Sequence, residues 1–224
     1  MKIYGAIGVV ALGLFLPAIT HATLILSPVA TANNTMGQFS VLLAPGNMIN
    51  QSGLNTPFVS GVTDYDSYIA ANPTHANLAS GNAFASPSGI TSGSIDFDLG
   101  DIFNIDKFVL WSDNPGGDTS SAPKNFSLLA SITSDFTSSI SLGSFVGSVG
   151  SSPIAAQVFS FDSTDARFVR WTIIDQYEQP NINVGEVAFS VIQPGEPVPE
   201  PATLVLICLG LAGLGYSRRQ LKAV

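Results

Sequence analysis

The amino-acid sequence predicts an all-β fold, a sandwich of short strands between two apolar chain ends. No long helical periodicity occurs between residues 23 and 197. Short runs rich in β-branched and aromatic residues recur there instead, separated by clusters of Gly, Ser, Asn, Asp and Pro. Short strands with turn signals at this spacing are typical of β-sandwiches. We therefore expect one domain over residues 23–192, flanked by an N-terminal signal helix and a C-terminal hydrophobic helix.

Local alternation of apolar and polar residues places the individual strands. Ser94 to Leu99 alternates cleanly, with Ile95 and Phe97 on one face and aspartates on the other. Residues 100–101 then predict a turn. The next run, residues 105–111, has apolar side chains on both faces, which indicates a strand that is buried on both faces. The expected strands are 39–43, 94–99, 105–111, 126–132, 142–146, 157–161, 167–174 and 184–192, and residues 65–71 are expected to form one short helix.

The part of the chain expected to be exported is acidic. Residues 23–197 hold four basic side chains against fifteen acidic ones, a net charge of −11. Binding to nucleic acid depends on cationic side chains that neutralise phosphates, so we expect no nucleic-acid partner. An anionic membrane surface is disfavoured for the same reason. Divalent cations and neutral sugars fit this charge better.

Cysteine and histidine are nearly missing from the expected domain, and this limits its chemistry. Cys208 lies in the C-terminal tail, so the domain can form no disulfide and has no cysteine nucleophile. His75 is the only histidine after residue 22, which excludes a His-rich zinc site. Asp175 and Glu178 are a spaced acid pair, but nothing around them indicates a glycosidase cleft. We expect no enzyme activity.

Residues 1–22 predict a secretory signal peptide. Lys2 precedes an apolar run that extends to Ile19, and Thr20-His21-Ala22 supplies a small-residue cleavage site. An uncleaved membrane anchor is the alternative.

The C-terminal tail, residues 199–224, has three parts and follows a linker at 193–198. Pro199-Glu200-Pro201 predicts a non-helical hinge, because proline fixes φ and disfavours helix in the residue before it. The apolar segment at 202–217 follows, and it is shorter than the roughly 20 residues that usually span a bilayer. Arg218 and Arg219 then end the segment on the cytoplasmic side.

This tail resembles the PEP-CTERM sorting signal of Gram-negative bacteria. The Pro-Glu-Pro motif, the Gly-rich apolar segment and the terminal Arg pair match that signal in order and spacing. The resemblance implies export by the secretion machinery, a transient stay in the inner membrane and recognition by an exosortase. It further implies removal of the tail and delivery to the cell surface or the exopolysaccharide matrix. A plain tail anchor with a chance Pro-Glu-Pro is the alternative.

Four segments of the domain resemble discoidin-type domains, also called coagulation-factor type C domains. They are the strand and turn at 95–100, the strand and turn at 126–136, the Arg-aromatic-Val-Arg strand at 166–171 and the closing strand at 184–189. The resemblance covers about residues 60 to 192 and implies a galactose-binding-like jelly roll. The first third of the domain has no clear counterpart in that family, and the disulfide that often joins its ends cannot form here.

The same resemblance implies a site for a structural calcium ion. Asp64-Tyr65-Asp66 lies where this family often holds calcium, and Asp64, Asp66 and Glu186 are the expected oxygen ligands. The alternative is an acidic turn in which Asp64 caps a short helix.

Loops at one end of such sandwiches usually hold the sugar site, where aromatic rings stack on the sugar and polar side chains bind its hydroxyls. The expected ligand-binding residues are Tyr177, Asp113, Asn114 and His75. For each of these residues, the alternative interpretation is an ordinary polar residue in a loop, with no role in binding.

Two arginines on the predicted strand at 167–174 need partners. We expect Arg167 and Arg170 to bind acidic neighbours or backbone carbonyls at the rim of the sandwich. Binding of a ligand carboxylate is the alternative.

Together these features predict an exported surface or matrix protein, sorted by an exosortase, whose domain binds extracellular polysaccharide without catalysis. A structural matrix protein that binds no glycan specifically is the second hypothesis. An extracellular hydrolase is the third.

Overall fold

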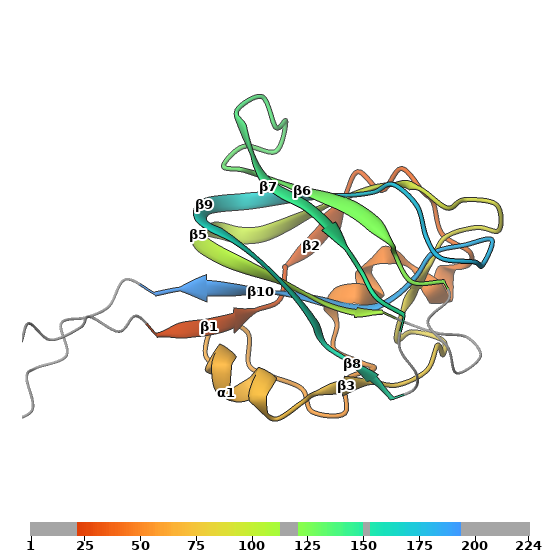
Figure 1. Cartoon of the computed structure of the whole chain (residues 1–224), viewed down its shortest axis with the longest axis horizontal. Coiled ribbons are helices and arrows are strands. Elements are labelled where there is room, and N and C mark those ends of the chain that lie inside the picture. The colour runs from red at the N-terminus through yellow and green to blue at the C-terminus, as the bar shows by residue number, and fades with distance from the viewer. Residues whose placement is uncertain (1–21, 113–120, 150–152, 194–224) are drawn as a thin grey trace, which may run out of the picture. The chain divides into compact units, whose positions relative to one another are not determined.

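Two long strands, β5 (Gly93–Ser112) and β9 (Gln157–Ile173), run the length of the domain and bend halfway along it. Figure 1 shows both strands curving at the same end of the domain, near the start of β1. The computed structural model describes residues 22–112, 121–149 and 153–193. All strand pairs within these ranges are antiparallel.

The bends divide the pairing of these two strands into two stretches. Residues 93–98 of β5 pair with 168–173 of β9, and residues 103–110 pair with 157–166. The register shifts between the two stretches, next to Gly100. The φ angle of Gly100 is +93°, a conformation that glycine adopts readily. Each of the two strands therefore contributes to both layers of a sandwich.

The first layer is completed by three shorter strands. β2 (Ala30–Ala32) pairs with the first part of β5. β6 (Asn125–Ser131) pairs with the last part of β9, and β7 (Ser139–Val146) pairs with β6.

The second layer is built around β10 (Asn183–Ile192), which pairs with the second part of β5. β1 (Thr23–Leu26) and β4 (Phe84–Ala85) pair with the other edge of β10. A small separate sheet joins β3 (Thr74–His75) to β8 (Ile154–Ala155). The predicted all-β jelly-roll sandwich is confirmed.

Aromatic rings fill the space between the two layers. Phe97, Phe126 and Trp171 from the first layer meet Phe108 and Phe189 from the second, and all five are fully buried. The ring centroid of Phe108 lies 5.4 Å from that of Trp171 and 5.4 Å from that of Phe189. Each such pair contributes about 0.5–1.5 kcal/mol beyond the burial of its area. The inward positions of alternating strands thus form one continuous core.

The outer face of the second layer is covered by α1 (Tyr65–Ala70) and the loops beside it. Trp111 and Val109 of β5 are fully buried there, and Trp111 packs edge-on against Tyr68 at 6.5 Å. The Trp111 Nε1–H donates to the Pro73 carbonyl oxygen at 3.0 Å. The predicted burial of this strand on both faces and the predicted short helix are confirmed.

The outer face of the first layer carries a buried carboxylate, that of Asp96. Arg170 donates to both of its oxygens, from Nε at 2.6 Å and from Nη2 at 2.8 Å. Asn33 adds a third hydrogen bond at 2.8 Å. The ring of Phe136 lies over the Arg170 guanidinium at 4.2 Å and covers it. Only 3% of the Asp96 side chain remains exposed.

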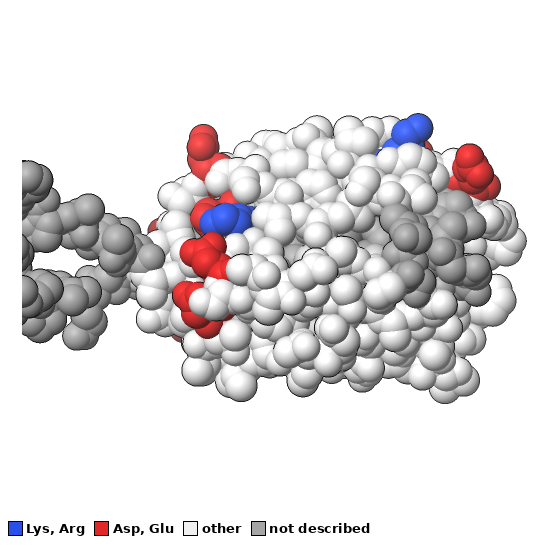
Figure 2. All heavy atoms as spheres, turned by 60° about the horizontal axis from the view of Figure 1, so that its bottom comes forward, with Lys and Arg blue, Asp and Glu red and all other residues white. Residues whose placement is uncertain are grey.

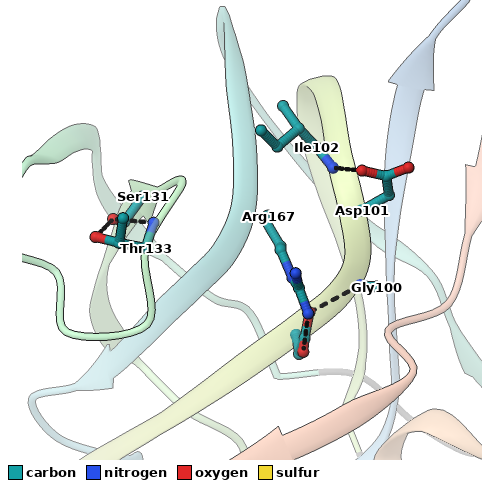
Figure 3. A network of polar contacts seen from close by, with 7 residues as sticks. Gly100, Asp101, Ile102, Ser131, Thr133 and Arg167 are labelled. Carbon is teal, nitrogen blue, oxygen red and sulfur yellow. Dashed lines mark hydrogen bonds and ion pairs between the residues drawn. The ribbon is translucent and has the colours of Figure 1, made fainter.

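The second arginine makes a more exposed pair at the bend. Arg167 donates through Nε to Asp98 at 3.1 Å, and this bond lowers the pKa of that carboxyl. Figure 3 shows Arg167 reaching across from β9 towards β5 beside Gly100. The expectation that both arginines bind acidic neighbours is confirmed.

Three details of the sequence prediction are wrong. Residues 39–43 form no strand; a short 3-10 helix, η1 (Val41–Leu43), lies there and is followed by η2 (Pro45–Ile49). The expected turn at 100–101 is a bend within one strand. The two strands expected at 157–161 and 167–174 are the single strand β9.

Both chain ends lie outside the described residues. These are the signal segment up to residue 21, the linker from residue 194 and the sorting tail at 199–224. Among the residues that the structure describes, no helix is long and apolar enough to cross a membrane.

We expect Arg170→Ala to destabilise the domain strongly, because it leaves the Asp96 carboxylate buried without its partner. Breaking a fully buried pair costs about 3–5 kcal/mol, and because the Arg170 side chain is 32% exposed and Asn33 still donates to Asp96, we expect a loss of about 2 kcal/mol here. Urea unfolding followed by tryptophan fluorescence measures the change.

Arg167→Ala is the matched control for this experiment. Its side chain is 42% exposed and that of its partner Asp98 is 22% exposed, so solvent screens this pair and its loss should cost much less stability than that of Arg170. Equal losses for the two variants would contradict the special role of the buried pair.

Candidate functional site

Loops gather at the end of the sandwich away from the bends of β5 and β9 (Figure 1). Backbone hydrogen bonds join three of them. The Phe39 N–H donates to the Ala85 carbonyl at 2.7 Å, and the Ser86 N–H donates to Ile182 at 2.9 Å. The loop at 176–182 is thereby joined to the segment at 33–47 through the segment at 85–90. We call this end, whose loops are joined by backbone hydrogen bonds, the loop end.

Tyr177 lies at the loop end, as expected, and is half-buried. Its hydroxyl donates to the Gly147 carbonyl at 2.6 Å, and Lys124 Nζ lies 5.4 Å from the ring centroid. Asp175 nearby accepts three hydrogen bonds from Asn125, each 2.9 Å long. These bonds lower the pKa of Asp175, so this carboxyl stays ionised at neutral pH. An ionised, fully bonded carboxylate is a poor general acid.

The other three expected ligand-binding residues are placed differently. Asp113 and Asn114 lie outside the described residues. His75 is fully buried, and its ring nitrogens face the carbonyl oxygens of Ala76 at 2.7 Å and Asn82 at 3.0 Å. Burial lowers the pKa of this imidazole. The ring packs flat against the backbone: a Cβ on Gly185 would lie only 2.6 Å from its Nδ1. His75 is therefore packed inside the protein and does not face solvent.

Sequence reasoning missed three exposed apolar side chains at the loop end. Phe39, Val41 and Leu42 are 63%, 82% and 55% exposed. The Leu42 carbonyl accepts hydrogen bonds from Asn47 Nδ2 at 2.9 Å and from the Gly81 N–H at 2.8 Å, which hold the segment in place. The run at 39–43 predicts a strand, and only the Pro-Gly pair after it signals that the chain leaves the sandwich.

The three carboxylates expected to bind calcium have separate partners. Asp64 accepts from the Ser67 N–H at 2.8 Å and caps α1, as the alternative interpretation proposes. Asp66 accepts from the Thr23 hydroxyl at 3.1 Å. No group of three or more His, Cys, Asp or Glu side chains within the described ranges could hold a metal ion. Calcium binding itself stays a prediction.

Glu186 is the most perturbed acidic group among the described residues. Its side chain is fully buried on β10, and Oε2 accepts from the Gln51 N–H at 2.7 Å. Its other oxygen, Oε1, is buried without a hydrogen-bond partner. Burial raises the pKa of Glu186 to about 8, against the opposing effect of the Gln51 hydrogen bond. An orphaned carboxylate oxygen of this kind fits either a retained proton or a bound cation.

Charged side chains are unevenly distributed over the domain. In the face that Figure 2 shows, acidic side chains gather towards one end, and a wide uncharged area separates them from a few charged groups at the other. Along the sequence, residues 22–63 contain no ionisable side chain. The loop end segment at 33–47 is therefore neutral.

Comparisons with known proteins identify the tail. Residues 197–219 match the family model described as the PEP-CTERM protein-sorting motif, which confirms the resemblance seen in the sequence. A search of curated protein sequences finds no match to this chain.

Solved structures similar to this chain are carbohydrate-binding modules. The CBM32 of AlyQ in complex with 4,5-unsaturated mannuronic acid is 19% identical, with 74% of this chain and 96% of that one covered and a TM-score of 0.48. The family 32 module of Clostridium perfringens NanJ in complex with galactose is 11% identical, with 75% and 98% covered and a TM-score of 0.49.

A longer structure, a truncated AlyQ with CBM32 and alginate lyase domains, is matched over 36% of its length and 81% of this chain, at 18% identity and a TM-score of 0.49. The chain thus spans about a third of that protein. The chain carries a PEP-CTERM protein-sorting motif at residues 197–219, and the solved structures similar to its jelly-roll sandwich include family 32 carbohydrate-binding modules.

Proposed function

We propose that this protein is exported, sorted by an exosortase and kept outside the cell as a non-catalytic polysaccharide-binding protein. The observation that carries this proposal is the sorting motif at 197–219. The apolar segment with its cleavage site at residues 1–22 supports the same route. The tail serves as a temporary anchor in the inner membrane, and the sandwich is the part that acts outside.

The loop end supports binding of a neutral polysaccharide. Phe39 is an exposed aromatic ring on a backbone fixed by hydrogen bonds, and Tyr177 is a second, half-buried ring. Aromatic faces bind the C–H face of a sugar, and a rigid surface loses little entropy when it binds. The neutral segment around Phe39 favours an uncharged glycan over an anionic one.

The contacts of Asp175, one of the acid pair in the hydrolase hypothesis, support a non-catalytic role. Asn125 already binds this carboxylate at both oxygens. Its lowered pKa makes Asp175 unsuited to act as the general acid that such a pair requires.

One observation favours the second hypothesis, a matrix protein without specific glycan binding. Val41 and Leu42 expose large aliphatic side chains beside Phe39. Such a patch also suits contact with another protein of the matrix.

Calcium binding is retained as a proposal at Glu186 alone. The buried oxygen Oε1 has no hydrogen-bond partner and would serve as one ligand, while a hard cation needs several further oxygens around it. A cation there would stabilise the carboxylate that burial now disfavours.

We expect Glu200→Ala to block processing of the tail in a host that has an exosortase. The wild-type protein should be recovered mostly in a shortened form outside the inner membrane, and the variant mostly at full length within it. Glu196→Ala in the linker is the matched control. Immunoblots of cell fractions measure the result, and normal processing of Glu200→Ala would contradict recognition of the motif.

We expect the exported protein to bind neutral oligosaccharides on a glycan array, and Phe39→Ala and Tyr177→Ala each to weaken that binding about tenfold, or 1.4 kcal/mol. Val59→Ala removes an equally exposed apolar side chain elsewhere and should change nothing. A blank array favours the structural matrix protein. Unchanged binding of both aromatic variants would remove the loop end as the site.

Glu186 makes the stability of the metal-free protein depend on pH. Its pKa is raised in the folded state from a usual 4.5 to about 8, so between these values the folded protein keeps a proton that the unfolded chain has lost. Stability therefore decreases as pH rises through this window, and the midpoint of thermal unfolding should fall between pH 5 and 8. Glu186→Gln should reduce this fall, whereas Glu178→Gln, on an exposed loop, should not.

The same proteins test the metal. Calcium added at pH 8 should raise the unfolding midpoint of the wild type and leave Glu186→Gln unchanged. The absence of any calcium effect on the wild type would remove the calcium proposal and leave the proton as the partner of Glu186.

A further inference from the structure

A groove with many hydroxyl groups lies at the bend of the sandwich, away from the loop end. It has a volume of about 510 Å³ and runs between the β6–β7 turn and the bend of β9. Six polar side chains line it: Asn104, Ser131, Ser138, Ser163, Thr164 and Asp165. Figure 3 shows this region, with Ser131 and Thr133 on one side of β9 and the bend of β5 on the other. We call it the hydroxyl groove.

Hydrogen bonds hold the β6–β7 turn, which forms one wall of the hydroxyl groove, in place. The Ser131 hydroxyl accepts from the Thr133 N–H at 3.1 Å and fixes the start of the turn. Asp135 at its tip accepts from the Thr137 N–H at 3.2 Å and from the Thr133 hydroxyl at 2.7 Å. The opposite wall belongs to β9. The groove therefore exists before any ligand arrives, which lowers the entropy cost of binding.

A second groove adjoins the hydroxyl groove, and the hydrogen-bonded pair Asn104–Asp165 lies between the two. Asn104 donates to Asp165 at 2.8 Å, and this pair lines both grooves. The second groove has a volume of about 380 Å³, and its walls are mostly apolar, with Phe103 and Ile102 among them. A hydroxyl-rich surface and an apolar one thus adjoin at the Asn104–Asp165 pair.

The lining of the hydroxyl groove selects the class of ligand. Hydroxyl and amide groups donate and accept hydrogen bonds equally well, which suits a ligand covered with hydroxyls. Ile132 and Ile140 are 52% and 57% exposed at its edge and offer an apolar contact for C–H groups. Asp165 is the only ionisable side chain in the lining, so an anion is disfavoured and too few carboxylates are present for a metal ion.

We propose that the hydroxyl groove is a second binding site for a neutral polysaccharide, so that one domain holds two glycan chains at its two ends. This inference rests on the proposed function for the class of ligand. The second site goes beyond that function, which requires only the loop end. Sites at opposite ends of one rigid sandwich connect separate polymer chains. Two weak sites on one particle also hold a matrix more firmly than either alone.

The number of oligosaccharides bound per chain tests this proposal. Isothermal titration of the exported protein with hexasaccharides of galactose, glucose and mannose should give two sites for the wild type. Ser163→Trp fills the hydroxyl groove from an exposed position and should leave one site. Phe39→Ala weakens the loop-end site about tenfold and should likewise leave one site of wild-type affinity, and the double variant should bind at least about tenfold more weakly than either.

Two further variants guard the result. Asp165→Ala removes the carboxylate without adding bulk and should also leave one site if the groove is real. Ser67→Trp adds the same bulk on the exposed surface of α1, outside the groove, and should keep both sites.

The outcomes separate this proposal from the proposed function. One site that Phe39→Ala removes and Ser163→Trp leaves intact would overturn the hydroxyl groove and keep the loop end. One site that only Ser163→Trp removes would keep the groove and overturn the loop end. No binding of any hexasaccharide would overturn both.

Discussion

The antiparallel pairing of β5 with β9 is the constraint on which the other elements depend. Because both strands bend at the same place, a single pair of strands supplies the centre of both layers, and all other main strands join one half or the other. The aromatic core lies in the angle between the halves. The Asp96–Arg170 pair then covers the first half from outside, so that a charged residue on a central strand is tolerated.

This arrangement gives the domain two unlike ends. The bend is made by two long strands whose pairing register shifts there, and its surface presents short polar side chains beside the exposed Ile132 and Ile140. The other end is made of loops tied to one another by backbone hydrogen bonds, and it presents exposed apolar side chains. A jelly roll that binds at both ends needs no second domain to connect two polymers.

The sequence predicts those features that depend on nearby residues. The alternation from Ser94 to Leu99 is visible because one face of that strand enters the core, and Asp64 is a recognisable cap because capping acts within one helical turn. The run Phe39 to Leu43 predicts a strand that the structure does not contain, since apolar composition alone does not reveal that Asn47 and Gly81 hold this run outside the core. The burial of His75 and the partner of Glu186 depend on segments more than a hundred residues apart, which local patterns do not encode. The hydroxyl groove lies between the β6–β7 turn and the bend of β9, two segments that local sequence patterns do not place side by side.

The uncharged segment at residues 22–63 affects how binding by this domain depends on salt concentration. Charged surfaces attract or repel over a distance that dissolved salt sets, about 10 Å at 0.1 M and about 30 Å at 0.01 M. The segment from residue 22 to residue 63 carries no ionisable group, so contacts made through it are insensitive to this distance. A protein that binds polysaccharide through such a surface would bind with similar affinity at low and at high ionic strength.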